Sequence, residues 1–158
     1  MTNQWERFAA AAVALLALPA VAADLEVRLS GAPDGGELVF QVYDAADAFG
    51  DLRDPAQEIR MSAHGDGSYA LTGLVAGEIA VLVYYDENGN GILDKNFIGI
   101  PRELLAISNN YQPKGPPTFA RASFVLDEDG ATALDLDMYR VLGDSGRWGL
   151  GLAVLTRS

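Results

Sequence analysis

The residues best suited to chemistry form one short acidic loop, DENGNGILD, at 86–94. EF-hand-type loops bind calcium through hard oxygen ligands at alternate positions, with a glycine at the sixth position and a main-chain carbonyl at the seventh. Counted from the first aspartate, this loop has side-chain oxygens at its first, third, fifth and ninth positions and a glycine at its sixth. The expected calcium ligands are Asp86, Asn88, Asn90, the carbonyl of Ile92, and Asp94.

The twelfth position of such a loop is normally a bidentate acid, but here it is Phe97. We therefore expect the missing oxygens to come from water or from a more distant acid, for which Glu103 is the candidate. The alternative is a plain turn, because the pairs Asn88-Gly89 and Asn90-Gly91 favour tight turns between strands. A turn explains the glycines but not the acids and amides at every other position, so ion binding is the favoured interpretation.

No catalytic constellation is readable in the sequence. The single histidine, His64, lies in a predicted turn with no recognisable Ser or Asp partner. Ser108 lacks a nucleophile-elbow sequence, and hydrogen bonds to the nearby loop backbone explain it better. We expect no enzymatic activity; the alternative is a carboxylate-dependent hydrolase with its site near Glu103 and Ser108.

The composition limits the partners. Twenty-two acidic residues against eleven basic ones give the 158-residue chain a formal charge of −11, which repels the phosphates of nucleic acids. We therefore expect no nucleic-acid partner. The absence of cysteine excludes disulfides and thiolate metal sites, so the domain must rely on its core and on bound ions.

The chain divides into three predicted segments. Residues 1–23 have Arg7, an apolar run, a proline and then small alanines, which predicts a signal peptide cleaved after Ala22 or Ala23. Residues 24–140 form the predicted domain. Residues 141–158 contain a linker followed by alternating large and small apolar residues, which predicts the first strand of a truncated outer-membrane barrel, an eighth strand of the domain or a frayed tail.

Period-two alternation between breaks rich in Gly, Pro and Asp predicts the elements of this domain. The seven predicted strands are 25–30, 38–43, 58–63, 68–72, 78–85, 119–126 and 132–139, the first two joined like a hairpin. We expect an all-β fold, a seven-stranded antiparallel Greek-key sandwich of immunoglobulin-like or transthyretin-like type. The strand 78–85 is apolar on both faces, which predicts a central position leading directly into Asp86. Residues 95–118 lack periodicity, and so long a connection is generally functional, disordered or pinned by something bound.

The order of short motifs gives a resemblance. DENGNG is followed by an aspartate, then by Asn96, GIP, Glu103, SNN and GPP before a phenylalanine. This order resembles an uncharacterised family of secreted bacterial proteins, the domain of unknown function numbered twenty-one forty-one. The resemblance implies a periplasmic or cell-surface β-sandwich similar to carrier modules. Tyr85 stands where this family commonly has a histidine, and Leu104-Leu105-Ala106-Ile107 replaces a Gly-containing aromatic stretch.

The tail is similar to the opening strand of outer-membrane barrels of the MipA/OmpV group. Taken together, these features predict an exported calcium-binding module with a binding or assembly role in the bacterial cell envelope. We expect it in the periplasm or at the cell surface, associated with an envelope protein or with a barrel of the same full-length chain.

Overall fold

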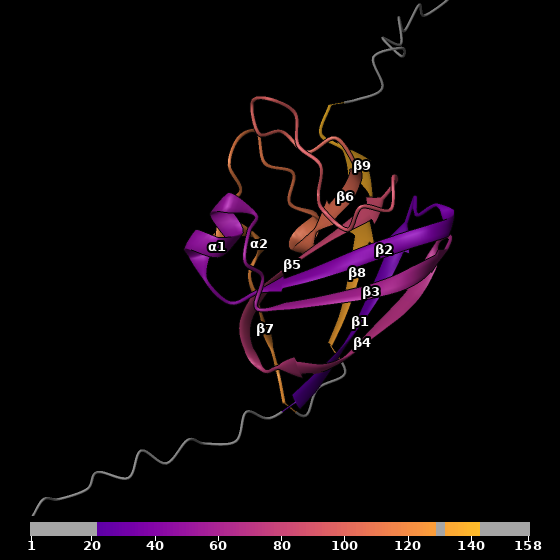
Figure 1. Ribbon diagram of the computed structural model, residues 1–158. Coiled ribbons are helices and arrows are strands. Elements are labelled where there is room, and N and C mark those ends of the chain that lie inside the picture. Colours follow the sequence, from indigo (N-terminus) through magenta and orange to yellow (C-terminus); the bar gives the residue numbers. More distant parts are fainter. Residues whose placement is uncertain (1–21, 129–131, 143–158) are drawn as a thin grey trace, which may run out of the picture.

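The computed structural model describes residues 22–128 and 132–142, which form two β-sheets packed against each other (Figure 1). The predicted signal peptide is outside these residues except for Ala22 and Ala23, and the whole of the predicted barrel strand, which follows the linker at 143–146, is outside them as well. None of the helices in the described ranges has the length and apolar character needed to span a membrane. The elements are β1 (Ala22–Ser30), β2 (Asp34–Tyr43), α1 (Ala46–Asp51), β3 (Gln57–His64), β4 (Gly67–Val75), β5 (Gly77–Asp86), β6 (Leu104–Ile107), a 3-10 turn (Ser108–Asn110), α2 (Phe119–Ala122), β7 (Phe124–Leu126), β8 (Thr132–Asp137) and β9 (Tyr139–Arg140).

The prediction of an all-β fold with two sheets is confirmed, but the described residues contain nine strands rather than seven. The strand β6 was missed because its four residues are uniformly apolar and carry no alternation. The predicted strand 119–126 is wrong in its first half, which is the helix α2; its Ala-containing sequence favours a helical turn. The predicted strand 132–139 is divided at Met138, whose N–H donates to the Ser30 carbonyl at 2.9 Å.

The smaller sheet has the order β4-β1-β8, and the larger has β3-β2-β5-β6-β9, with β7 pairing one end of β5. β1 is antiparallel to β4 but parallel to β8, so the prediction of a wholly antiparallel fold is wrong at this pair. The predicted hairpin between the first two strands is also wrong. Residues 31–33 instead carry the chain from one sheet to the other, with Gly31 in the left-handed region at φ +76°.

The two central strands of the larger sheet, β2 and β5, are buried on both faces. On one face, Phe40, Val81 and Val83 pack against the buried residues of β1 and β4 between the two sheets. On the opposite face, Leu82 and Tyr84 lie in a second cluster with Phe49 of α1, next to which Phe119 of α2 packs with a ring-centroid separation of 6.1 Å. Because β5 contributes to both clusters and pairs with β2 and β6, its predicted central position is confirmed.

One buried polar atom in this second cluster gives a test of the packing. The hydroxyl of Tyr84 is buried and has no hydrogen-bond partner among the described residues, whereas the Tyr43 hydroxyl donates to Gln41 Oε1 at 2.8 Å. Removing an unpartnered buried hydroxyl relieves a desolvation cost, so Tyr84→Phe is expected to raise the free energy of unfolding by about 1 kcal/mol. The matched change Tyr43→Phe should lower it by about 1 kcal/mol. Urea unfolding measures both, and equal losses in the two variants would contradict the expectation.

Candidate functional site

The acidic loop is organised around the carboxylate of its first residue. Asp86 ends the central strand β5 and is only 4% exposed. Its Oδ1 atom accepts hydrogen bonds from the N–H groups of Gly89 at 2.8 Å and Asn90 at 3.2 Å, and its Oδ2 atom accepts one from Gly91 at 2.6 Å. A single buried carboxylate therefore folds the loop into a ring of inward-pointing amides, which is the arrangement expected of an anion-centred turn.

The other predicted side-chain ligands meet on the exposed side of this ring. Asp94 Oδ2 accepts hydrogen bonds from the amide nitrogens of Asn88 at 2.6 Å and Asn90 at 3.2 Å. The side-chain oxygens of these two asparagines accept backbone N–H groups two residues further on, at 3.0 Å from Asn90 and 2.8 Å from Ile92. The structure thus brings four of the predicted residues together in one hydrogen-bonded network.

Glu103 lies against the inner side of the loop and closes it. It is 3% exposed, and its two oxygens accept N–H groups from Glu87 and Asp94, each at 3.1 Å. Burial raises the pKa of Glu103, the two N–H groups oppose this, and the nearby carboxylates of Asp86 and Asp94 raise the pKa further. One side chain therefore fastens the residue that enters the loop to the residue that leaves it.

Two arginines from other strands hold the outside of the loop, and the sequence reasoning missed both. Arg60 of β3 donates to the Gly91 carbonyl at 3.0 Å, and a Cβ atom at Gly91 would lie 2.5 Å from its Nη1 atom. Arg140 of β9 forms an ion pair with Glu87 and donates to the Arg102 carbonyl at 3.0 Å. No local sequence signal links these arginines to the loop, because strand pairing brings them there.

The twelfth loop position faces solvent. Asn96 Oδ1 accepts the N–H groups of Ile98 and Ile100, both at 3.0 Å, and so forms a tight turn. This turn leaves the Phe97 side chain 98% exposed, and Ile92 is also exposed. In the described part of the chain, no group of three or more His, Cys, Asp or Glu residues is arranged to hold a metal ion. The predicted calcium ligands are not a group of this kind, because they include two asparagine side chains and a main-chain carbonyl.

The SNN segment joins elements that are distant in sequence. Ser108 is fully buried; its hydroxyl donates to the Ala122 carbonyl at 2.6 Å and accepts the Val81 N–H at 3.0 Å. The Asn109 side chain donates to the carbonyls of Arg121 and Ser123, and Asn110 exchanges two hydrogen bonds with the backbone of β8 in the smaller sheet. This segment therefore connects the larger sheet to α2 and to the smaller sheet, with both asparagines at positive φ.

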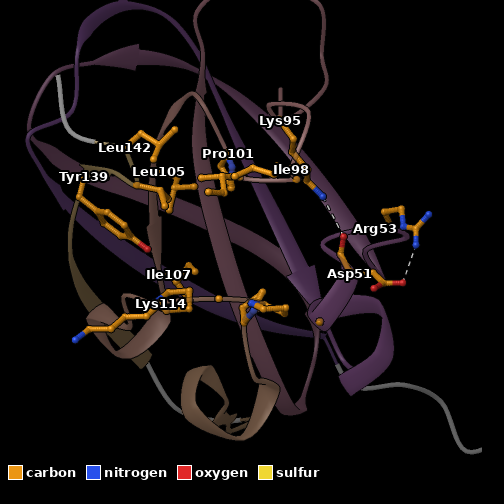
Figure 2. A pocket seen from close by; sticks show the side chains of 18 residues that line it. Asp51, Arg53, Lys95, Ile98, Pro101, Leu105, Ile107, Lys114, Tyr139 and Leu142 are labelled. Carbon is orange, nitrogen blue, oxygen red and sulfur yellow. Dashed lines mark hydrogen bonds and ion pairs between the residues drawn. The ribbon is translucent and has the colours of Figure 1, made fainter. Parts of the chain in front are cut away.

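A pocket of about 840 Å³ opens beside the acidic loop (Figure 2). Residues from five separate stretches of the chain line it: 50–53, 95–101, β6, 113–117 and 139–142. Neither Glu103 nor Ser108, the residues of the hydrolase alternative, is among its lining residues. The pocket was not predicted, but it is formed in large part by the connection at 95–118, for which a functional role was one of three expected alternatives.

Lys95 joins the acidic loop to this pocket. It follows Asp94 directly, is half-buried, and donates from its ammonium to the carbonyls of Asp51 at 3.0 Å and Leu52 at 3.5 Å, where α1 ends (Figure 2). Burial lowers the pKa of Lys95, the Arg53 guanidinium lowers it further, and Asp51 opposes both effects. A basic group at the last carbonyls of a helix is a favourable arrangement, so Lys95 anchors the loop to α1.

Comparison with known proteins gives one match. A family model described as an uncharacterized protein conserved in bacteria, DUF2141, matches residues 27–134. These residues include the acidic loop, Glu103, the SNN segment and most of the pocket lining. A search of curated proteins gave no match to the chain.

Proposed function

Because the chain belongs to the DUF2141 family of uncharacterised bacterial proteins, we propose a function from its own residues: a calcium-binding β-sandwich module with a binding role in the cell envelope. The observation that carries the proposal is the network in which Asp86, Asn88, Asn90 and Asp94 meet within one loop. Oxygen-rich side chains at alternate positions, around a glycine with φ +73° at the sixth, are the ligands and the bend that calcium requires.

The ion would occupy the exposed side of the loop, where Asp94 faces the two asparagines. Its binding requires the Asn88 and Asn90 amide groups to rotate, so that their oxygens face Asp94 in place of their nitrogens. The Ile92 carbonyl and water complete the oxygen shell. Glu103 lies on the inner side of the loop, away from this position, and there accepts the N–H groups of Glu87 and Asp94, so we assign it a bracing role in place of the role of a calcium ligand.

The ion would act on the pocket through the chain that follows the loop. Lys95 and the turn at 96–100 come directly after Asp94 and line the pocket wall. Fixing Asp94 therefore fixes one side of the pocket. We place this module in the periplasm or at the cell surface, where calcium is available to weak extracellular sites, with an envelope protein or a barrel of the same chain as its partner. Export by a signal peptide at 1–23 is part of this proposal.

Calcium should stabilise the protein in a way that depends on Asp94. A ligand that binds only the folded state adds about 1.4 kcal/mol to the free energy of unfolding at ten times its dissociation constant. Asp94→Asn is expected to abolish this gain, because it removes the charged ligand while keeping the shape of the side chain. Thermal unfolding with increasing calcium measures the effect, and magnesium should give a smaller shift because it demands a stricter geometry.

The matched control is Asp44→Asn, which removes the same charge from an exposed aspartate on another loop. This variant should keep the full response to calcium. The calcium proposal fails if millimolar calcium leaves the melting temperature unchanged, or if both variants lose the response equally, since the effect would then reflect general charge screening.

A further inference from the structure

The lining of the pocket has a charge opposite to that of the protein. Three of its residues are basic, Arg53, Lys95 and Lys114, and only Asp51 is acidic, whereas the whole chain carries a formal charge of −11. The acidic surface repels anions, so a concentration of positive charge in one cavity favours an anionic ligand there.

The three basic groups are not equivalent. The Arg53 guanidinium is neutralised by the Asp51 carboxylate at 2.7 Å, and Lys114 is exposed to solvent. Lys95 is half-buried, and within the described ranges no carboxylate lies within 4 Å of its ammonium. Its two hydrogen bonds go to neutral carbonyls and leave the third N–H available. A partly desolvated, uncompensated cation is the group in this pocket that gains most from an anion.

The remainder of the lining is apolar. In Figure 2, Lys95 and Asp51 lie on one side of the pocket and Tyr139 lies on the other. The apolar side chains of Leu105, Pro101 and Ile98 lie between these two sides. Ile107 and the proline-rich stretch 113–117 complete the wall. The volume of about 840 Å³ is within the range of small-molecule sites, roughly 300–1,000 Å³, and such sites combine an apolar wall with a few polar anchors.

We propose that this pocket binds a small amphipathic carboxylate, with its apolar body against Leu105 and Ile107 and its carboxylate on the Lys95 ammonium. The inference rests on the proposed role as a binding module but not on the calcium site. It identifies the ligand chemistry and assigns Lys95 as the residue that selects for negative charge.

Isothermal titration of the purified protein with decanoate tests this inference. Decyltrimethylammonium carries the same chain with the opposite charge, and butanoate carries the same anion with little apolar surface. Decanoate is expected to bind at least tenfold more tightly than either, because both halves of the pocket contribute to its affinity. Equal binding of decanoate and decyltrimethylammonium would show a site without charge selection and would overturn the proposal.

Two variants locate the ligand. Lys95→Met keeps an unbranched side chain and removes the charge, and it should weaken decanoate binding about tenfold, the effect of one charge-assisted hydrogen bond. Arg28→Met is the control: it removes a positive charge from β1, outside the pocket lining, and should change the affinity little. Gly50→Leu should block the pocket: Gly50 has no positive φ, and among the described residues outside its own helix the atom nearest the added Cβ would be the Pro117 carbonyl oxygen, at an ordinary contact distance of 3.8 Å.

Thermal unfolding first establishes that each variant is folded. Unchanged decanoate affinity in both folded Lys95→Met and Gly50→Leu variants would place binding elsewhere and overturn the assignment. The titrations are repeated with calcium and with a chelator. Decanoate binding that persists when calcium has no effect on stability would refute the ion site alone, whereas a calcium response without decanoate binding would refute the pocket alone.

Discussion

Replacing Glu103 with alanine is expected to lower the free energy of unfolding by about 2 kcal/mol, because it leaves two part-buried N–H groups without their acceptor, each at the lower end of the cost of about 1–3 kcal/mol for a buried group. Both groups, those of Glu87 and Asp94, belong to the loop that precedes the pocket wall. Partial relief of the cost of burying the carboxylate keeps the loss below the sum of the two. Urea unfolding measures the loss, and hydrogen exchange should show faster exchange of the loop amides.

Two further variants make this result specific. Glu103→Gln keeps one acceptor but turns an N–H group toward the second backbone N–H, so an intermediate loss is expected. Glu128→Ala removes an exposed acid and should have almost no effect. A loss below about 0.5 kcal/mol in Glu103→Ala would contradict the bracing role. The hydrolase alternative predicts a different outcome for Glu103→Gln: loss of a measurable turnover with a melting temperature nearly unchanged.

Ser108→Ala is expected to destabilise the protein by about 2–3 kcal/mol, although the change removes only one oxygen atom. The Ser108 hydroxyl accepts the N–H group of Val81 in the middle of the central strand. No other side chain of the described residues accepts this N–H group. It also donates to Ala122 at the end of α2. Both partners are buried, so water cannot readily replace the lost oxygen.

The matched control is Ser62→Ala, a serine on the exposed face of β3. This change should alter the free energy of unfolding by less than about 0.5 kcal/mol. Comparing urea midpoints of the two alanine variants isolates the effect of the buried hydroxyl. Equal midpoints for both variants and the unchanged protein would show that Ser108 does not connect these elements in solution.

The local part of the site was predictable because it depends on residues close in sequence. Alternating oxygens around Gly91 indicated an organised loop at the end of a central strand, and that loop and that strand are present. The resemblance in motif order is confirmed by the family match. The calcium ion itself stays a prediction. Glu103 was predicted as a calcium ligand, and we now propose that it braces the loop. Its contacts with the N–H groups of Glu87 and Asp94 depend on the path of residues 95–103, which the sequence does not indicate.

The remaining features depend on pairings that no window of sequence contains. β1 pairs with β8 in parallel, with Leu25 opposite Thr132. The two strands are more than 100 residues apart, so no turn motif in the sequence indicates this pairing. The pocket is likewise assembled from five distant stretches, and each stretch alone resembles an ordinary loop or strand. Arg60 and Arg140 reach the loop only through the strand order. The strand count was wrong for two simpler reasons: β6 is too short to show a period, and the predicted strand 132–139 is divided into β8 and β9.

The position of β1 has a consequence for the order in which the protein folds. Synthesis begins at the amino terminus, yet β1 is the middle strand of its sheet and one of its two neighbours is β8, near the end of the described chain. The larger sheet can start from the adjacent pairing of β2 with β3, but the smaller sheet stays incomplete until residues 132–137 have been made. Closing so long a loop is slow, and until then β1 keeps an unpaired edge that could join another chain. The first strand is therefore the edge of this domain most open to wrong pairing until its last long strand has been made.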